Sequence, residues 1–265
     1  MNIRRLGWAG VELESAGHTA VIDAVDDFGQ LTEITGESKT PLPPAREGAS
    51  LALVTHLHRD HTDPLALARV LEPGGGVLLR PGPATGEFLE VAATIPAEKE
   101  LEAAGLRDVR TVDPWQTTTV GPFTATAVPA VDGFGDPQVS WIVEAGGVTV
   151  FHGGDTTFHG SWWLIAMRHG PIDVAFLPCN GPVCDFPHRQ PASPLPAAMT
   201  PEQAAVAAQL LQARVAVPMH YDAIDAPPVY APVADAPARF AAGATTPVSL
   251  VEVGEEVELP NAQPA

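Results

Sequence analysis

The sequence predicts an α/β fold of the four-layer αββα sandwich type. The first half of the chain is rich in strand patterns, and the second half alternates helix and strand patterns. Polar side chains suited to metal binding follow strands in both halves. With 265 residues the chain is long enough to bury a sizeable core, and we expect a single domain over 1–265.

The opening segment predicts a β-meander. Residues 10–14 alternate apolar and polar side chains, and strand-like segments at 3–6 and 19–23 flank them. Residues 27–49 are rich in glycine, proline and charge, which predicts a loop or flap. This segment could be a lid beside a site or a simple insertion.

A short apolar strand at 50–54 leads into the most informative stretch of the chain. Residues 55–61 read Thr-His-Leu-His-Arg-Asp-His, and Asp63-Pro64 then predicts a helix start with an aspartate N-cap and proline in the first position. We therefore place three histidines and an aspartate on a tight loop between a strand and a helix.

The spacing within this loop favours two metal positions. His56 and His58 are two residues apart, which puts both imidazoles on one side of an extended backbone. Asp60 and His61 follow after the chain turns, so they can face a second point nearby. Imidazole and carboxylate ligands suit zinc and similar divalent metals.

The remaining elements follow from the same patterns. Further strands are predicted at 77–80, 109–112, 117–120, 123–128, 139–144, 148–151, 174–177, up to 220, and 248–252. Helices are predicted at 64–71, 96–104, 161–168 and 201–213, the last with a capping box that begins at Thr200 and includes Gln203. Residues 261–265 are expected to form a frayed tail.

Two later motifs also follow strands. Residues 153–156 read Gly-Gly-Asp-Thr after the strand at 148–151, and residues 217–221 read Val-Pro-Met-His-Tyr. Together with the earlier His-x-His-x-Asp-His motif, and in this order along the chain, the two motifs resemble the signature of the metallo-β-lactamase-fold hydrolases. The resemblance covers about residues 3–221. The spacing is most similar to the branch of L-ascorbate-6-phosphate lactonase and N-acyl-phosphatidylethanolamine phospholipase D.

The resemblance implies an αββα sandwich with two divalent metal ions at one edge, Zn²⁺ in the first instance and Mn²⁺ or Fe²⁺ as alternatives. It implies the following ligands: His56 and His58 for the first metal, Asp60, His61 and His220 for the second, and Asp155 as a bridge. Asp23 resembles an aspartate that supports the metal loop in this family without binding metal.

The chain departs from the family at one ligand. Asp132 stands where the family has a histidine that completes the first metal site. Aspartate binds zinc and suits manganese or iron well, so we expect Asp132 to be a ligand. The alternative is that Asp132 is too short to reach, which would leave one metal or none.

The resemblance implies a metal-dependent hydrolase in which metal-activated hydroxide attacks a small-molecule ester, lactone or phosphodiester. Asp60 and Asp155 are candidate catalytic residues beside the nucleophile. His159 is a third candidate, which could bind substrate, donate a proton or replace the absent histidine, or could be an exposed loop residue. A non-catalytic or mononuclear binding protein on the same fold remains the alternative, and an iron redox enzyme would need a flavin or thiol partner.

Composition narrows the classes of binding partner that we expect for this chain. The formal net charge of -18 disfavours nucleic acid, because nucleic-acid binders normally carry basic patches. No apolar run approaches a membrane span of about 18 to 20 residues, and no signal peptide is evident, so we expect a cytoplasmic protein without membrane contact. We expect Cys179 and Cys184 to be free thiols. The sequence defines no oligomeric state.

Overall fold

The computed structural model describes residues 1–83 and 93–259, and its strands form two six-stranded sheets. The first sheet is ordered β1-β2-β3-β4-β5-β6 and the second β13-β11-β10-β9-β8-β7, with a two-stranded ribbon of β12 and β14 beside them. The strands of the first sheet are β1 (Asn2–Arg5), β2 (Val11–Ser15), β3 (His18–Ile22), β4 (Leu51–Leu53), β5 (Val77–Arg80) and β6 (Asp108–Thr111). The others are β7 (Thr117–Val120), β8 (Phe123–Pro129), β9 (Val139–Ala145), β10 (Val148–His152), β11 (Val174–Pro178), β12 (Val183–Cys184), β13 (Val215–Met219) and β14 (Tyr230–Ala231).

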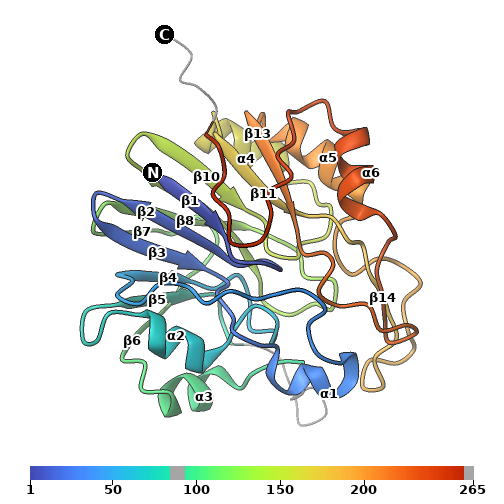
Figure 1. Cartoon of the computed structure of the whole chain (residues 1–265), viewed down its shortest axis with the longest axis horizontal. Helices are drawn as coiled ribbons and strands as arrows, with labels where there is room; N and C mark the ends of the chain where they lie inside the picture. Colours follow the sequence, from blue (N-terminus) through green and yellow to red (C-terminus); the bar gives the residue numbers. More distant parts are fainter. Residues whose placement is uncertain (84–92, 260–265) are drawn as a thin grey trace.

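Helices cover the outer faces of both sheets. The helices are α1 (Thr32–Thr35), α2 (Pro64–Val70), α3 (Ala97–Ala103), α4 (Trp162–His169), α5 (Pro201–Leu210) and α6 (Ala236–Gly243), with a short 3₁₀ turn, η1 (Gly29–Leu31), before α1. Figure 1 shows α2 and α3 beside β4 to β6, and α4, α5 and α6 beside β10 to β13. This arrangement confirms the predicted αββα sandwich.

The alternation of side chains along each strand builds the layers. On β11, Val174 and Phe176 belong to the core between the sheets, whereas Ala175 and Leu177 pack in the cluster under the second set of helices. On β4, Ala52 faces the helix side, where it joins the cluster of α2 and α3. Strands buried on both faces are therefore apolar throughout, as expected for the parallel parts of a sheet.

Strand direction concentrates the functional segments at one edge. Within the second sheet β8, β10, β11 and β13 run in the same direction, and within the first β3, β4 and β5 are parallel. The loops that follow β3, β4, β8, β10 and β13 carry the polar motifs of the sequence. Carboxyl ends of parallel strands are where such folds place their binding sites.

Four expectations need correction. Residues 248–252 form no strand, because the chain meets β13 in a single bridge between Val248 and Ala216 and then leaves the sheet. The predicted loop at 27–49 contains η1 and α1, the helix predicted at 201–213 ends at Leu210, and α6 was not predicted from its Ala/Pro-rich sequence. The predicted frayed tail at 261–265 lies outside the described residues.

The start of α5 is capped as predicted. The Thr200 hydroxyl accepts a hydrogen bond from the Gln203 backbone N–H, and the Gln203 side chain accepts one from the Thr200 N–H. We expect Thr200→Ala to lower the free energy of unfolding by about 1 kcal/mol, because one N–H of the first turn loses its acceptor. Urea unfolding beside the exposed-site control Thr245→Ala tests this, and equal midpoints for the two variants would contradict it.

Candidate metal centre

The seven side chains predicted as metal ligands come together as two adjoining groups. They are His56, His58, Asp132 and Asp155 in the first group, and Asp60, His61 and His220 in the second. Within each group one nitrogen or oxygen of every residue lies within 4.8 Å of the others. One small pocket touches both groups, since His58, Asp60, Asp155 and His220 all line it. All seven residues are buried.

The loop after β4 is held tightly enough to aim its side chains. The backbone N–H groups of His61 and Thr62 both donate to the His58 carbonyl, and the Thr62 hydroxyl donates to the His56 carbonyl at 2.7 Å. Asp63 then caps α2 as predicted, accepting from two backbone N–H groups at 3.0 Å each. Helix start and turn together fix where the imidazoles point.

Asp23 holds this loop in place through hydrogen bonds. Its carboxylate accepts hydrogen bonds from the Thr55 N–H at 2.8 Å, the Thr55 hydroxyl at 2.7 Å and the His61 Nδ1 at 2.7 Å. Because the Thr55 hydroxyl donates to Asp23, its oxygen accepts from the His56 Nδ1 at 3.0 Å. Both His56 and His61 therefore turn Nε2 towards the site, with their Nδ1 protons already committed.

Three buried atoms of the first group have no hydrogen-bond partner: His56 Nε2, Asp132 Oδ1 and Asp155 Oδ1. The other Asp132 oxygen accepts from the N–H groups of Phe134 and Asp136, at 2.7 and 2.9 Å, which points Oδ1 at the site. Buried polar atoms are normally paired, so three converging unpaired atoms indicate a partner of positive charge.

His58 completes the first group from the same loop. Its Nε2 donates to Asp136 Oδ2 at 2.8 Å, and its Nδ1 faces Asp132 Oδ1 at 3.7 Å. Burial lowers the pKa of His58, but the carboxylates of Asp132 and Asp136 outweigh it and raise the pKa to about 9. Burial raises the pKa of Asp155 to about 7. The group combines two imidazoles with two carboxylates, a donor set that suits a divalent cation.

The second group brings two imidazole nitrogens face to face. The Nε2 atoms of His61 and His220 are 3.1 Å apart, and each is 3.5 Å from Asp60 Oδ2. The Trp8 indole N–H donates to the same Asp60 oxygen, and His220 Nδ1 lies 3.0 Å from the Asn180 side-chain oxygen and donates to it. Two nitrogen lone pairs this close repel unless a proton or a metal ion lies between them.

These donors fit divalent ions. Each group combines imidazole nitrogens and carboxylate oxygens, the set that zinc, manganese and iron share. Bound ions would supply partners for the unpaired atoms of the first group and for the facing nitrogens of the second group. Asp132, the residue that departs from the family pattern, lies within its group and points its unpaired oxygen inwards.

Several supporting residues were not predicted from the sequence. Asp136, Asn180 and Trp8 each hold a candidate ligand through one hydrogen bond, and Arg189 donates to Asp136 at 2.9 Å. The only local signal was the second aspartate of the Asp-Gly-Phe-Gly-Asp segment at 132–136. The other contacts join segments far apart in the chain.

His159 lies apart from both groups. Its ring stacks on Trp162 with centroids 4.3 Å apart, and its Nδ1 accepts the Ser161 N–H at 3.1 Å. Burial lowers the pKa of His159 to about 4, so the ring is neutral at neutral pH. This placement does not favour the predicted roles in proton donation or metal binding.

The other polar residues singled out near the motifs have structural surroundings. His152 is buried, and its Nε2 donates to the Ala9 carbonyl at 2.7 Å. Cys179 and Cys184 are both free and buried, which confirms the expectation of free thiols, and burial raises the pKa of the Cys184 thiol to about 12. Neither cysteine joins a metal-binding group among the residues that the structure describes.

Comparison with known proteins agrees with this geometry. Residues 18–221 match the family described as the beta-lactamase superfamily domain, and the chain belongs to that superfamily. It is 31% identical over 266 residues to the UPF0173 metal-dependent hydrolase of Thermococcus kodakarensis, with 94% of this chain and 100% of the relative covered. The chain is therefore a metal-dependent hydrolase of the UPF0173 family.

Solved structures share the fold at low sequence identity. A possible metal-dependent hydrolase from Veillonella parvula superposes with a TM-score of 0.69 at 15% identity, covering 97% of this chain and 98% of that chain. An isothiocyanate hydrolase from Delia radicum gut bacteria gives a TM-score of 0.68 at 14% identity, covering 97% and 99%. At such identities the likeness concerns the fold and leaves the substrate open.

No helix among residues 1–83 and 93–259 combines the length and apolar character needed to cross a membrane.

Proposed function

We propose that this chain hydrolyses an uncharged small-molecule ester or lactone at a centre of two divalent ions. His56, His58 and Asp132 would hold the first ion, Asp60, His61 and His220 the second, and Asp155 would lie between them. The observation that carries the proposal is the convergence of unpaired, buried ligand atoms from three separate loops, beside a second group that includes His220 from a fourth. Zn²⁺ is the first expectation, with Mn²⁺ or Fe²⁺ also suited to the carboxylate-rich first group.

When bound, such ions lower the pKa of water and polarise the carbonyl that is attacked. Burial raises the pKa of Asp60, but the histidines His61 and His220 outweigh it and lower the pKa below its usual range, so this carboxylate is ionised at neutral pH. The Trp8 N–H fixes Asp60 Oδ2 at 3.0 Å. The water oxygen would bond to the carbonyl carbon, the ester C–O bond would break, and Asp60 would pass the water proton to the leaving oxygen.

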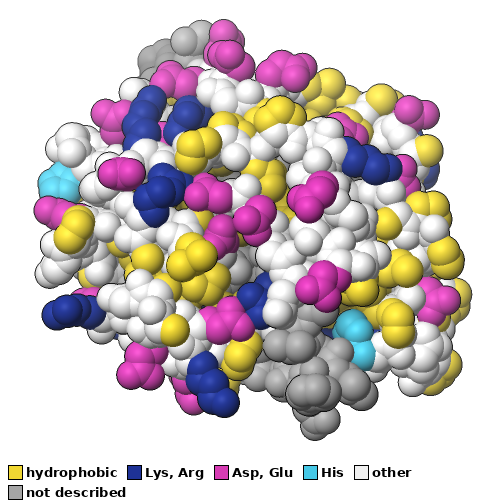
Figure 2. All heavy atoms as spheres, turned by 60° about the horizontal axis from the view of Figure 1, so that its bottom comes forward, with side chains coloured by type: hydrophobic (Ala, Val, Ile, Leu, Met, Phe, Trp, Pro, Cys, Tyr) yellow, Lys and Arg dark blue, Asp and Glu magenta, His cyan; other side chains and the backbone are white. Residues whose placement is uncertain are grey.

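The charges beside the site favour a neutral substrate over a phosphodiester. A phosphodiester carries a negative charge and is usually bound by arginine or lysine. Here Arg59 is paired with Glu100 at 2.8 and 2.7 Å, and Arg189 with Asp136 at 2.9 Å. Figure 2 shows carboxylates spread over one face of the molecule, in keeping with the net charge of -18. This acidic surface also supports a small molecule over a nucleic acid as the substrate.

A substrate panel tests the proposal. We expect the metal-loaded protein to hydrolyse 4-nitrophenyl acetate and a simple γ-lactone with kcat/KM at least tenfold above that for bis(4-nitrophenyl) phosphate, because Arg59 and Arg189 are already paired with carboxylates. Chelation should abolish the activity, and added Zn²⁺ or Mn²⁺ should restore it. Asp155→Asn is the matched inactive variant. Metal binding without turnover of any substrate would instead support a non-catalytic binding protein.

A further inference from the structure

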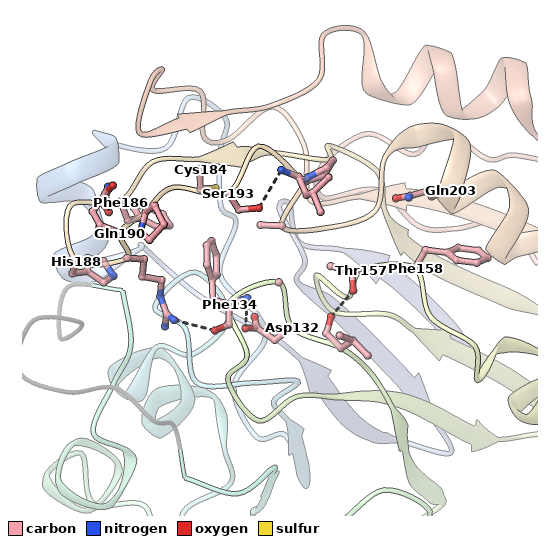
Figure 3. A pocket seen from close by; sticks show the side chains of 17 residues that line it. Asp132, Phe134, Thr157, Phe158, Cys184, Phe186, His188, Gln190, Ser193 and Gln203 are labelled. Carbon is pink, nitrogen blue, oxygen red and sulfur yellow. Dashed lines mark hydrogen bonds between the residues drawn. The ribbon is translucent and has the colours of Figure 1, made fainter.

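A cleft of about 750 Å³ opens beside the metal pocket. One side is formed by residues 131–134 after β8, and the other by the long loop 184–197 between β12 and α5. Figure 3 shows Asp132 and Phe134 on one side and Cys184, Phe186 and Ser193 on the other. A volume of this size suits a drug-sized organic group.

The cleft and the metal pocket share a wall. Phe134, Phe186, Arg189 and Ala197 line both of them, and Asp132 lies at the cleft while its carboxylate belongs to the first ligand group. A molecule with its reacting bond in the metal pocket would therefore extend its remaining part into the cleft. This step rests on the proposed function.

The shared wall is aromatic. The rings of Phe134 and Phe186 lie 5.4 Å apart, and His188 stacks on Phe186 with centroids 5.5 Å apart. The Arg189 guanidinium lies over Phe134 at 5.1 Å from the ring centre. Aromatic faces of this kind bind flat or extended apolar groups by contact area.

Several polar side chains of the cleft are engaged by the protein itself. Each of the following makes a hydrogen bond to a neighbouring residue: Thr157 to the Val131 carbonyl (3.1 Å), Arg189 to the Phe134 carbonyl (3.0 Å), Gln190 to Asp185 (2.7 Å), Ser193 from the Leu195 N–H (3.1 Å) and Gln203 from the Thr200 N–H (3.0 Å). These bonds already satisfy part of the hydrogen-bonding capacity of the lining, which leaves fewer groups to compensate a buried charge. The lining thus suits an uncharged group better than an ionic one.

The two walls are packed closely where they meet the site. At Gly133 a Cβ atom would overlap the Ala197 backbone, so glycine lets the loop approach the turn that carries Asp132. Arg189 reinforces the approach, since it bonds to Asp136 from the opposite wall. The wall of the cleft is therefore tied to the segment that carries Asp132.

We propose that the cleft binds an uncharged aromatic or long-chain apolar acyl group of the substrate, and so selects such esters over short-chain ones. The metal-loaded protein should hydrolyse 4-nitrophenyl 3-phenylpropanoate and octanoate with kcat/KM about tenfold or more above the acetate, as expected when apolar groups gain contact in a pocket. The preference should fall about tenfold in Ser193→Trp, where an indole fills part of the cleft. Thr245→Trp, at an exposed position that lines neither cavity, is the matched control and should keep it.

Equilibrium binding separates this proposal from the proposed function. Titration calorimetry with 4-phenylbutanamide, an uncharged amide that need not react, should show tenfold weaker binding to Ser193→Trp than to the wild type. If no ester is hydrolysed but this difference appears, the cleft proposal stands and the proposed function fails. If esters are hydrolysed with no dependence on the acyl group and Ser193→Trp binds the amide like the wild type, the cleft proposal is overturned and the proposed function stands.

Discussion

Asp132→Ala is expected to reduce the metal content from two ions per chain to one and to lower kcat/KM about a thousandfold. The Asp132 Oδ1 is buried and unpaired, and its other oxygen is fixed by two backbone N–H groups. Removing the carboxylate takes away a ligand and its charge together, which costs several kcal/mol of stabilisation in the transition state. Elemental analysis of protein purified without chelators or affinity-tag metals, beside hydrolysis rates, measures both effects.

Two companion variants sharpen this test. Asp132→His introduces the residue type that the sequence resemblance predicts at this position, and should retain more metal than Asp132→Ala. Asp113→Ala removes an exposed carboxylate and should leave two ions bound. If Asp132→Ala still binds two ions, Asp132 is not a metal ligand. If Asp132→Ala and the wild type each bind one ion, the mechanism must use a single metal.

Asp23→Asn is expected to weaken metal binding ten- to a hundredfold and to destabilise the fold by about 1 to 3 kcal/mol. Asp23 is fully buried and accepts three hydrogen bonds, from Thr55 twice and from His61. An asparagine has one acceptor oxygen in place of two, so its amide N–H₂ would face a donor. His61 would then lose the partner that holds its Nε2 towards the site.

Competition with a chromogenic chelator measures the metal affinity, and urea unfolding of the metal-free protein measures the stability. The matched control is Asp225→Asn, where the carboxylate belongs to an exposed ion pair with Lys39 and should contribute little. Unchanged metal affinity in Asp23→Asn would show that the imidazoles are oriented by the loop backbone alone. Both measurements are independent of substrate identity.

The local elements were predictable because their causes lie close together in the chain. The Asp63-Pro64 cap, the Thr200 capping box and the histidine pair at 56 and 58 each depend on residues within a few positions of one another. The resemblance to a known family predicted the fold and the candidate ligands in more detail than hydrophobic periodicity could. Strand alternation placed most strands within a residue or two of their observed ends.

The strand predicted at 248–252 failed for a physical reason. These residues alternate like a strand, but a strand needs a neighbour along its length, and here the pairing ends after one bridge. His159 lies four positions from Asp155, and its ring stacks on Trp162 while it belongs to neither ligand group, so its catalytic role stays a prediction. Closeness in sequence could reveal neither the lost pairing nor this stacking.

The sequence by itself determined the class of chemistry, since six of the seven candidate ligands lie in three short motifs and the seventh, Asp132, lies between the first and second of them. Only the tertiary structure decided how those ligands are held. Strand pairing within one sheet brings Asn180 to His220 and Trp8 to Asp60, whereas Asp136 reaches His58 because the two sheets pack against each other. The cleft beside the metal pocket also depends on tertiary structure, because its walls, residues 131–134 and 184–197, are far apart in the sequence.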